Sequence, residues 1–286
     1  MPYIHTRSFR CRHYECDAYG RLSPAAYLGY MQETAFDASA AVGYGAARYA
    51  EIGYQWLAYE TDITYLRPLH YGDTVEIKTW VVDFRRVRSL RNYEFYRDGK
   101  LVAHATTDWV LIDTRAMYPA AIPPEIIAAY SQGEAVIPAP PRPPFPLTPP
   151  VPSNAFTLTR RVEWRDIDPA IHVNNAVYLH YAADAELQAL RTFGWTSANL
   201  RDSDAAILAQ RYQIEYKFAA TLDDEIILTT WVSQVEAAGG LRHTLVHRAA
   251  DRKLLAKVRS EWRWGSAASG DAMPLPDTLA AQLLER

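Results

Sequence analysis

Apolar side chains recur at helical spacing in two segments of the chain, one in each half. In the first half, the pattern predicts a helix over residues 24–42, with Ser23 as the N-cap and Gly43 as the stop. In the second half, the same pattern predicts a helix over Asn174–Phe193, stopped by Gly194. Each predicted helix has about 20 residues and a length of roughly 30 Å.

Each predicted helix follows a short strand-like run and precedes longer runs rich in Val, Ile, Thr, Tyr and Trp. Several of these runs alternate apolar and polar positions, which is typical of strands with one buried face. Residues 97–100, Arg-Asp-Gly-Lys, are a hairpin turn signal between two of them. The order predicts an α+β fold in which an antiparallel sheet wraps around a long helix. The predicted strands are Ser8–Tyr14, Leu57–Leu66, Thr74–Phe84, Ser89–Arg97 and Leu101–Asp113, with Thr157–Trp164 before the second helix.

Both helices belong to a repeat that extends through most of the chain at a constant offset of 151 residues. Matches at a fixed offset indicate a tandem duplication of one domain. The prediction is a first domain over residues 1–130, a linker over 131–155 and a second domain over 156–286. Matched pairs include Asp17 and Asp168, Tyr27 and Tyr178, Asp73 and Asp224, Trp80 and Trp231, and, after two extra residues in the second copy, Trp109 and Trp262.

The linker contains nine prolines in the sixteen residues Ile137–Pro152. This composition favours extended polyproline II and excludes a helix or a central strand. At about 3.1 Å per residue it can span roughly 50 Å. Recognition of its Pro-x-x-Pro pattern by a partner domain is the alternative interpretation.

Composition narrows the classes of function. A net charge of −3 and a pI near 6.2 give no electrostatic attraction to nucleic acid or to an anionic membrane. The two cysteines, Cys11 and Cys16, have no counterparts in the second copy, which suggests neither a disulfide framework nor a metal site. With no secretory signal and no run of 18 apolar residues, we expect a cytoplasmic protein.

The most specific pattern is Asp-Ile-Asp-Pro-Ala-Ile-His-Val-Asn-Asn-Ala-Val-Tyr at residues 166–178, which opens the second helix. With the strands on either side, it resembles the hotdog-fold thioesterases, particularly the 4-hydroxybenzoyl-CoA thioesterase-like group and the tandem acyl-ACP thioesterases. The resemblance covers both copies and nearly the whole chain apart from the linker. Because family members usually act as dimers, it implies that the two hotdog domains form an intramolecular pseudo-dimer.

The resemblance implies an acyl-CoA or acyl-ACP thioesterase that needs neither a cofactor nor a metal. In that family the aspartate at the position of Asp168 is the nucleophile or general base, and the N–H at the position of Asn175 polarises the thioester carbonyl. The plant-type acyl-ACP enzymes have further polar catalytic residues, whose places here hold Ala170, Ala219 and Ala220. The simpler scheme of an aspartate and a helix amide therefore fits better.

The residue types agree with this chemistry, and each has a structural alternative. Asp168 can attack a carbonyl or deprotonate water, but it can also be an Asx-turn residue before a helix. His172 can orient Asp168 or the water, or it can be a loop histidine bonded to the backbone. Asn174 can contact the substrate, although an N-cap role is the favoured interpretation. Tyr178 is a further candidate contact.

The first copy departs from the pattern at the positions that matter for catalysis. Asp17 is retained, but Arg21 replaces the histidine, Ser23 replaces the first asparagine and Pro24 replaces the second. Proline has no N–H and cannot supply the oxyanion donor. We therefore predict one working site at Asp168 and a weak or vestigial one at Asp17.

A basic run in the first copy, Arg85, Arg86, Arg88 and Arg91, is matched in the second by Glu236, Ala237, Gly239 and Arg242. Of this run, Arg85, Arg86 and Arg88 are candidates to bind the phosphates of CoA or of a carrier-protein phosphopantetheine. The alternative is a solvated strand edge.

Two other functions are alternatives to a thioesterase: a non-catalytic acyl-thioester-binding hotdog protein, and a hotdog hydratase or dehydratase. A homodimer of the tandem chain is a further expectation.

Overall fold

The computed structural model describes residues 3–131, 143–153 and 155–284. The chain divides into two compact units, Met1–Pro144 and Phe145–Arg286, and their boundary falls within the predicted linker. Residues 143–153 of that linker run without helix or strand, and residues 132–142 lie outside the described part. Among the described residues, no helix combines the length and apolar character needed to cross a membrane.

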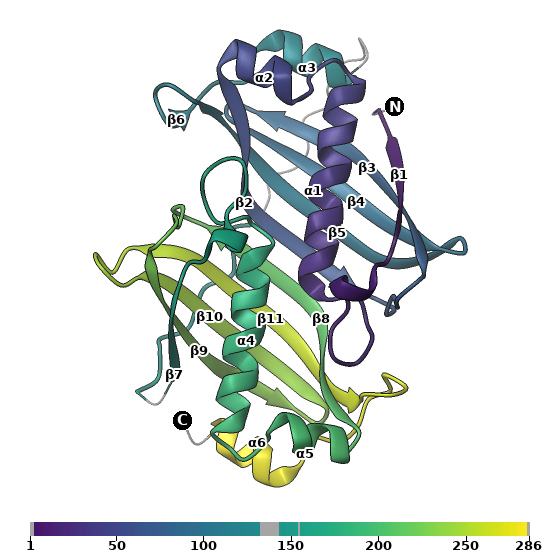
Figure 1. Cartoon of the computed structure of the whole chain (residues 1–286), viewed down its shortest axis with the longest axis vertical. Coiled ribbons are helices and arrows are strands. Elements are labelled where there is room, and N and C mark those ends of the chain that lie inside the picture. The colour runs from purple at the N-terminus through teal and green to yellow at the C-terminus, as the bar shows by residue number, and fades with distance from the viewer. Residues whose placement is uncertain (1–2, 132–142, 154, 285–286) are drawn as a thin grey trace. The chain divides into compact units, whose positions relative to one another are not determined.

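Unit 1 is an antiparallel sheet with one long helix against it (Figure 1). Its strands lie in the order β1-β3-β4-β5-β2, and β6 pairs with β5. The helix, α1, buries the residues that recur every three or four positions, among them Leu28, Met31, Ala35 and Ala38. The elements are β1 (His5–Arg10), the 3-10 turn η1 (His13–Glu15), α1 (Pro24–Ala41), α2 (Ala46–Ile52), β2 (Tyr54–Tyr65), β3 (Thr74–Arg85), β4 (Arg88–Arg97), β5 (Lys100–Asp113), β6 (Tyr118–Pro119) and α3 (Pro124–Ser131).

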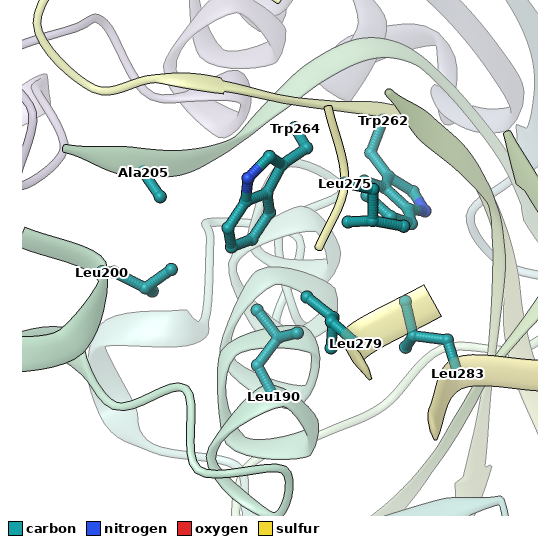
Figure 2. Close-up of a cluster of buried hydrophobic side chains, with 8 residues drawn as sticks. All are labelled: Leu190, Leu200, Ala205, Trp262, Trp264, Leu275, Leu279 and Leu283. Atoms are coloured by element: carbon teal, nitrogen blue, oxygen red, sulfur yellow. The ribbon is translucent and has the colours of Figure 1, made fainter. Parts of the chain in front are cut away.

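Unit 2 repeats this arrangement, with strand order β7-β9-β10-β11-β8 and the long helix α4 against the sheet (Figure 1). Its core includes a buried cluster to which α4, α5, α6, β8 and β11 all contribute (Figure 2). Trp264 is the largest fully buried side chain of the cluster. The elements are β7 (Phe156–Arg161), the 3-10 turn η2 (Trp164–Asp166), α4 (Val177–Arg191), α5 (Ser197–Asp202), β8 (Ala205–Tyr216), β9 (Glu225–Glu236), β10 (Gly239–Arg248), β11 (Leu254–Ser266) and α6 (Asp277–Leu284).

The two long helices and the strands after them lie where the sequence pattern predicts them, but several predicted boundaries are wrong. The first strand of each unit lies earlier than predicted, and a 3-10 turn replaces its predicted end at Tyr14 and at Trp164. Helix α4 begins at Val177 with Ala176 as the N-cap, so Asn174 is not the N-cap. Because the helix begins later than predicted, the second asparagine of the motif, Asn175, lies in the turn before it.

Candidate active site

A closed loop between η2 and α4 presents Asp168. An isolated bridge between Ile167 and Val173 closes this loop. Inside it, the Asp168 N–H donates to the carbonyl of His172 at 3.0 Å. These backbone contacts fix the position of Asp168 in the loop that precedes α4.

The Asp168 carboxylate is held on both oxygens. Oδ1 accepts the N–H of Ala170 at 2.8 Å, which is the Asx turn of the structural alternative. Oδ2 accepts a hydrogen bond from Nδ2 of Asn174 at 3.1 Å. Each carboxylate oxygen has two lone-pair sites, so both remain able to accept or attack. The side chain keeps 15% of its surface exposed, which leaves it accessible from solvent.

His172 does not hydrogen-bond Asp168. Its Nδ1 lies 3.8 Å from Asp168 Oδ1, which is too long for a hydrogen bond, and 3.2 Å from the carbonyl oxygen of Val173. The geometry therefore agrees with a loop histidine bonded to the backbone. Its other ring nitrogen, Nε2, is buried and has no hydrogen-bond partner among the described residues.

The two asparagines of the motif have separate tasks. Asn174 joins the loop to the helix, because its Oδ1 accepts the N–H of Ala176 at 2.9 Å while its Nδ2 holds Asp168. The carbonyl of Asn175 accepts the Tyr216 hydroxyl at 3.0 Å. In the part of the chain that the structure describes, the Asn175 N–H has no acceptor. The turn thus presents a free donor one residue after the side chain that holds the carboxylate.

Asp166, the first aspartate of the motif, makes buried contacts that the sequence analysis missed. It is buried, and its Oδ2 accepts the Tyr181 hydroxyl at 2.7 Å and the Glu163 N–H at 2.9 Å. In unit 1, Glu15 and Tyr30 make the equivalent contact. A carboxylate and a tyrosine at matched places in both copies were the signal for this contact.

Replacing Tyr181 by Phe is expected to destabilise unit 2, because Asp166 loses one of its two donors while it remains buried. The expected cost is about 1–3 kcal/mol, seen as a lower thermal unfolding midpoint. Tyr30→Phe is the matched variant in unit 1. An unchanged midpoint for Tyr181→Phe would mean that this contact does not stabilise unit 2.

The unit 1 loop has the same backbone hydrogen bond but different donors to its carboxylate. The Asp17 N–H donates to the carbonyl of Arg21 at 2.7 Å, and its Oδ1 accepts the N–H groups of Tyr19 at 2.9 Å and Arg21 at 3.1 Å. Burial raises the pKa of the Asp17 carboxyl above its ordinary value, against the lowering effect of these donors. Ser23 lacks the side-chain amide that its unit 2 counterpart uses, and Pro24 has no N–H.

Two of the three predicted phosphate-binding arginines are already paired. Arg85 lies 3.1 Å from Asp83, and Arg88 lies 3.0 Å from Asp108, with both carboxylates buried. Arg86 is exposed in the turn between β3 and β4, and among the described residues it has no ion-pair partner. Of these three arginines, Arg86 is therefore the one whose charge no carboxylate of the described residues neutralises.

Tyr178 belongs to the core. It is 3% exposed, and its ring packs edge-on against Tyr216 with 5.6 Å between centroids. Burial raises its pKa to about 12. Tyr27 packs against Tyr65 in the same way in unit 1. A contact present in both copies indicates packing, so the geometry gives no support for Tyr178 as a substrate contact.

A surface hollow of about 740 Å³ lies elsewhere on unit 2, at the β9–β10 turn and the adjoining parts of β8 and β11. Its lining, which includes Gln210, Gln234, Arg259 and Arg263, contains none of the predicted site residues. The candidate site is therefore defined by the Asp168 loop and not by this hollow.

Comparisons with known proteins agree with the duplicated fold. Residues 2–130 match the family model of the acyl-ACP thioesterase N-terminal domain, and residues 162–283 match that of the thioesterase-like superfamily. The 12:0-ACP thioesterase from Umbellularia californica superposes with a TM-score of 0.72 at 22% identity, over 92% of this chain and 94% of that one. An acyl-ACP thioesterase from Bacteroides thetaiotaomicron gives 0.69 at 20% identity, over 91% and 98%.

Two sequence relatives cover different lengths of the chain. The dodecanoyl-[acyl-carrier-protein] hydrolase of Cinnamomum camphora is 25% identical over 283 residues, which are 91% of this chain and 68% of the relative. The acyl-CoA thioesterase YbgC of Haemophilus influenzae is 35% identical over 86 residues, which are 30% of this chain and 63% of the relative.

Two units, each with a long helix against an antiparallel sheet and a carboxylate loop before the helix, define a tandem hotdog protein. The chain therefore combines a match to the acyl-ACP thioesterase N-terminal domain in its first half with a match to the thioesterase-like superfamily in its second. It is therefore placed among the thioester hydrolases.

Proposed function

We propose that the protein hydrolyses an acyl-CoA or acyl-ACP thioester at the Asp168 loop of unit 2. One observation carries the assignment of the site. Asn174 holds the Asp168 carboxylate at 3.1 Å, and the next residue, Asn175, presents an N–H without an acceptor among the described residues. A nucleophile or base and an oxyanion donor are the two groups that acyl transfer requires.

The reaction can begin in two ways at this carboxylate. Asp168 either attacks the carbonyl carbon, forming an acyl anhydride that water then hydrolyses, or takes a proton from water that attacks instead. In both routes negative charge develops on the carbonyl oxygen, and in this proposal the Asn175 N–H stabilises it. The carbon–sulfur bond then breaks, and the thiolate leaves and takes up a proton.

The substrate class follows from the relatives, whose names include both acyl-CoA and acyl-carrier-protein hydrolysis. Among the predicted phosphate ligands, Arg86 is the side chain we retain, because carboxylates already hold Arg85 and Arg88. Arg86→Ala is expected to raise KM for acyl-CoA about fivefold and to leave kcat unchanged. Kinetics with an acyl-N-acetylcysteamine thioester, which has no phosphate, are the control.

The first experiment is release of free thiol from short, long and aromatic acyl-CoA and acyl-ACP substrates. Turnover of either carrier class supports the proposal. Binding of the substrates without thiol release would contradict it and favour a non-catalytic acyl-thioester-binding protein. Hydration of a 2-enoyl thioester with the thioester bond intact would instead favour a hydratase.

We also propose that the two units pair within one chain as a pseudo-dimer, because each unit alone corresponds to one protomer of the dimers in this fold class. Homodimerisation of the tandem chain is a separate proposal. Light scattering coupled to gel filtration tests it, since the chain has a mass of 32.4 kDa and a dimer would show twice that value.

A further inference from the structure

Ile171, in the Asp168 loop, has a backbone conformation that its side chain disfavours. Its φ is +62°, in the left-handed region, where a β-branched residue is an outlier. In unit 1, Gly20 occupies the same position with φ +74° and has no such penalty. The loop geometry therefore accepts glycine without strain, and unit 2 has isoleucine there.

The isoleucine side chain does not contribute to the core. It is 73% exposed, so the strain of its backbone is not offset by burial. Of the six non-glycine residues with positive φ in the described chain, it is the only β-branched one. Strain without a folding benefit at a candidate catalytic loop points to a functional contact.

The position of Ile171 relates it directly to the reacting groups. Its N–H donates to the carbonyl of Asp168 at 2.9 Å, so both residues belong to one turn. Two residues later, the Val173 N–H donates to the carbonyl of Ala220 at 2.9 Å. The segment around Ala220 carries two more exposed apolar side chains, Phe218 and Leu222. Exposed apolar side chains thus stand on two segments that a backbone hydrogen bond joins, one of which carries the carboxylate.

We propose that Ile171 contacts the acyl chain next to the thioester carbonyl and helps to select the acyl group, a role that rests on the hydrolysis proposed at Asp168. The chemistry favours the acyl side of the thioester. The pantetheine side carries amides, which lose hydrogen bonds to water if they are covered by an apolar side chain. Methylene groups gain free energy from the same contact.

The test compares Ile171→Asn with Ile171→Leu in the full chain. Asparagine tolerates the left-handed conformation and removes the apolar surface, whereas leucine keeps that surface. For a long-chain acyl-CoA, we expect kcat/KM to fall about tenfold with Ile171→Asn and to stay within about twofold with Ile171→Leu. For acetyl-CoA, we expect both variants to match the wild type. The thermal unfolding midpoint of Ile171→Asn should rise.

Met117→Asn is the matched control, because Met117 is also exposed and apolar with a positive φ of +51°, and it lies in unit 1 before β6. It should raise the unfolding midpoint without changing kcat/KM. If the wild type and Ile171→Asn hydrolyse long-chain acyl-CoA equally well, this inference is wrong and the proposed function still stands. Equal losses on long and acetyl substrates would also overturn it, because the effect would then not depend on the acyl chain. A wild type without any thioesterase activity would refute the proposed function instead.

Discussion

Replacing Asp168 by Asn is expected to lower kcat for thioester hydrolysis by about 10²–10⁴-fold, because the amide can neither attack the carbonyl nor deprotonate water. The loop should survive the change, since an Asn side-chain oxygen can still accept the Ala170 N–H in the same turn. Thiol release under saturating substrate measures the effect. The thermal unfolding midpoint checks that the variant is folded.

Asp17→Asn is the matched control in the other copy. Its loop lacks the donor that would stabilise an oxyanion, because Pro24 has no N–H. We expect kcat to change by less than about twofold, since the altered side chain lies outside the catalytic loop. Equal losses from the two single variants would contradict the assignment of a single working site and would give unit 1 a catalytic role.

Much of the fold could be predicted because its signals are local. Alternating residues and the turn at residues 97–100 predicted β5 from Leu101, one residue after its actual start at Lys100. The first strand of each unit was misplaced because these strands carry few apolar residues and lie at the sheet edge, as β1 (His5–Arg10) does. Their ends depend on pairing with β3 and β9, which no local pattern reveals.

The site was predicted as a set of residues but not as a set of contacts. Asparagine is a residue type preferred at N-caps, and Asn174 was predicted to be one. Its side chain also bonds Asp168, and the regular helix begins only at Val177. The role of Asp166 depends on Tyr181, fifteen residues later. Such pairings come from tertiary packing, which the secondary-structure propensities of single residues do not encode.

The paired arginines illustrate the same limit for charge. Arg85 and Arg88 were predicted to bind phosphate because unit 2 has no equivalent basic run. Asp83 pairs with Arg85, and Asp108 pairs with Arg88. Asp108 lies on β5, the strand that pairs with β4, where Arg88 lies. A count of charges along the chain cannot show which of them strand pairing brings together.

Asn175→Pro is expected to lower kcat by about 10²–10³-fold, because it deletes the proposed oxyanion donor and leaves Asp168 in place. Unit 1 supports the view that the turn can accept proline. There Ser23 and Ala26 form the same backbone hydrogen bond, at 3.0 Å, that Asn174 and Val177 form in unit 2. The carbonyl at this position also accepts a tyrosine hydroxyl in both units, so proline retains that contact.

Asn175→Ala separates the backbone from the side chain, because alanine keeps the N–H and removes the amide group. If the N–H is the donor, the alanine variant keeps kcat within about threefold of the wild type while the proline variant loses it. A large loss from both variants would assign the role to the Asn175 side chain instead. Near-normal kcat in a folded proline variant would exclude this N–H as the oxyanion donor, and the stabilising group would then have to come from elsewhere in the protein.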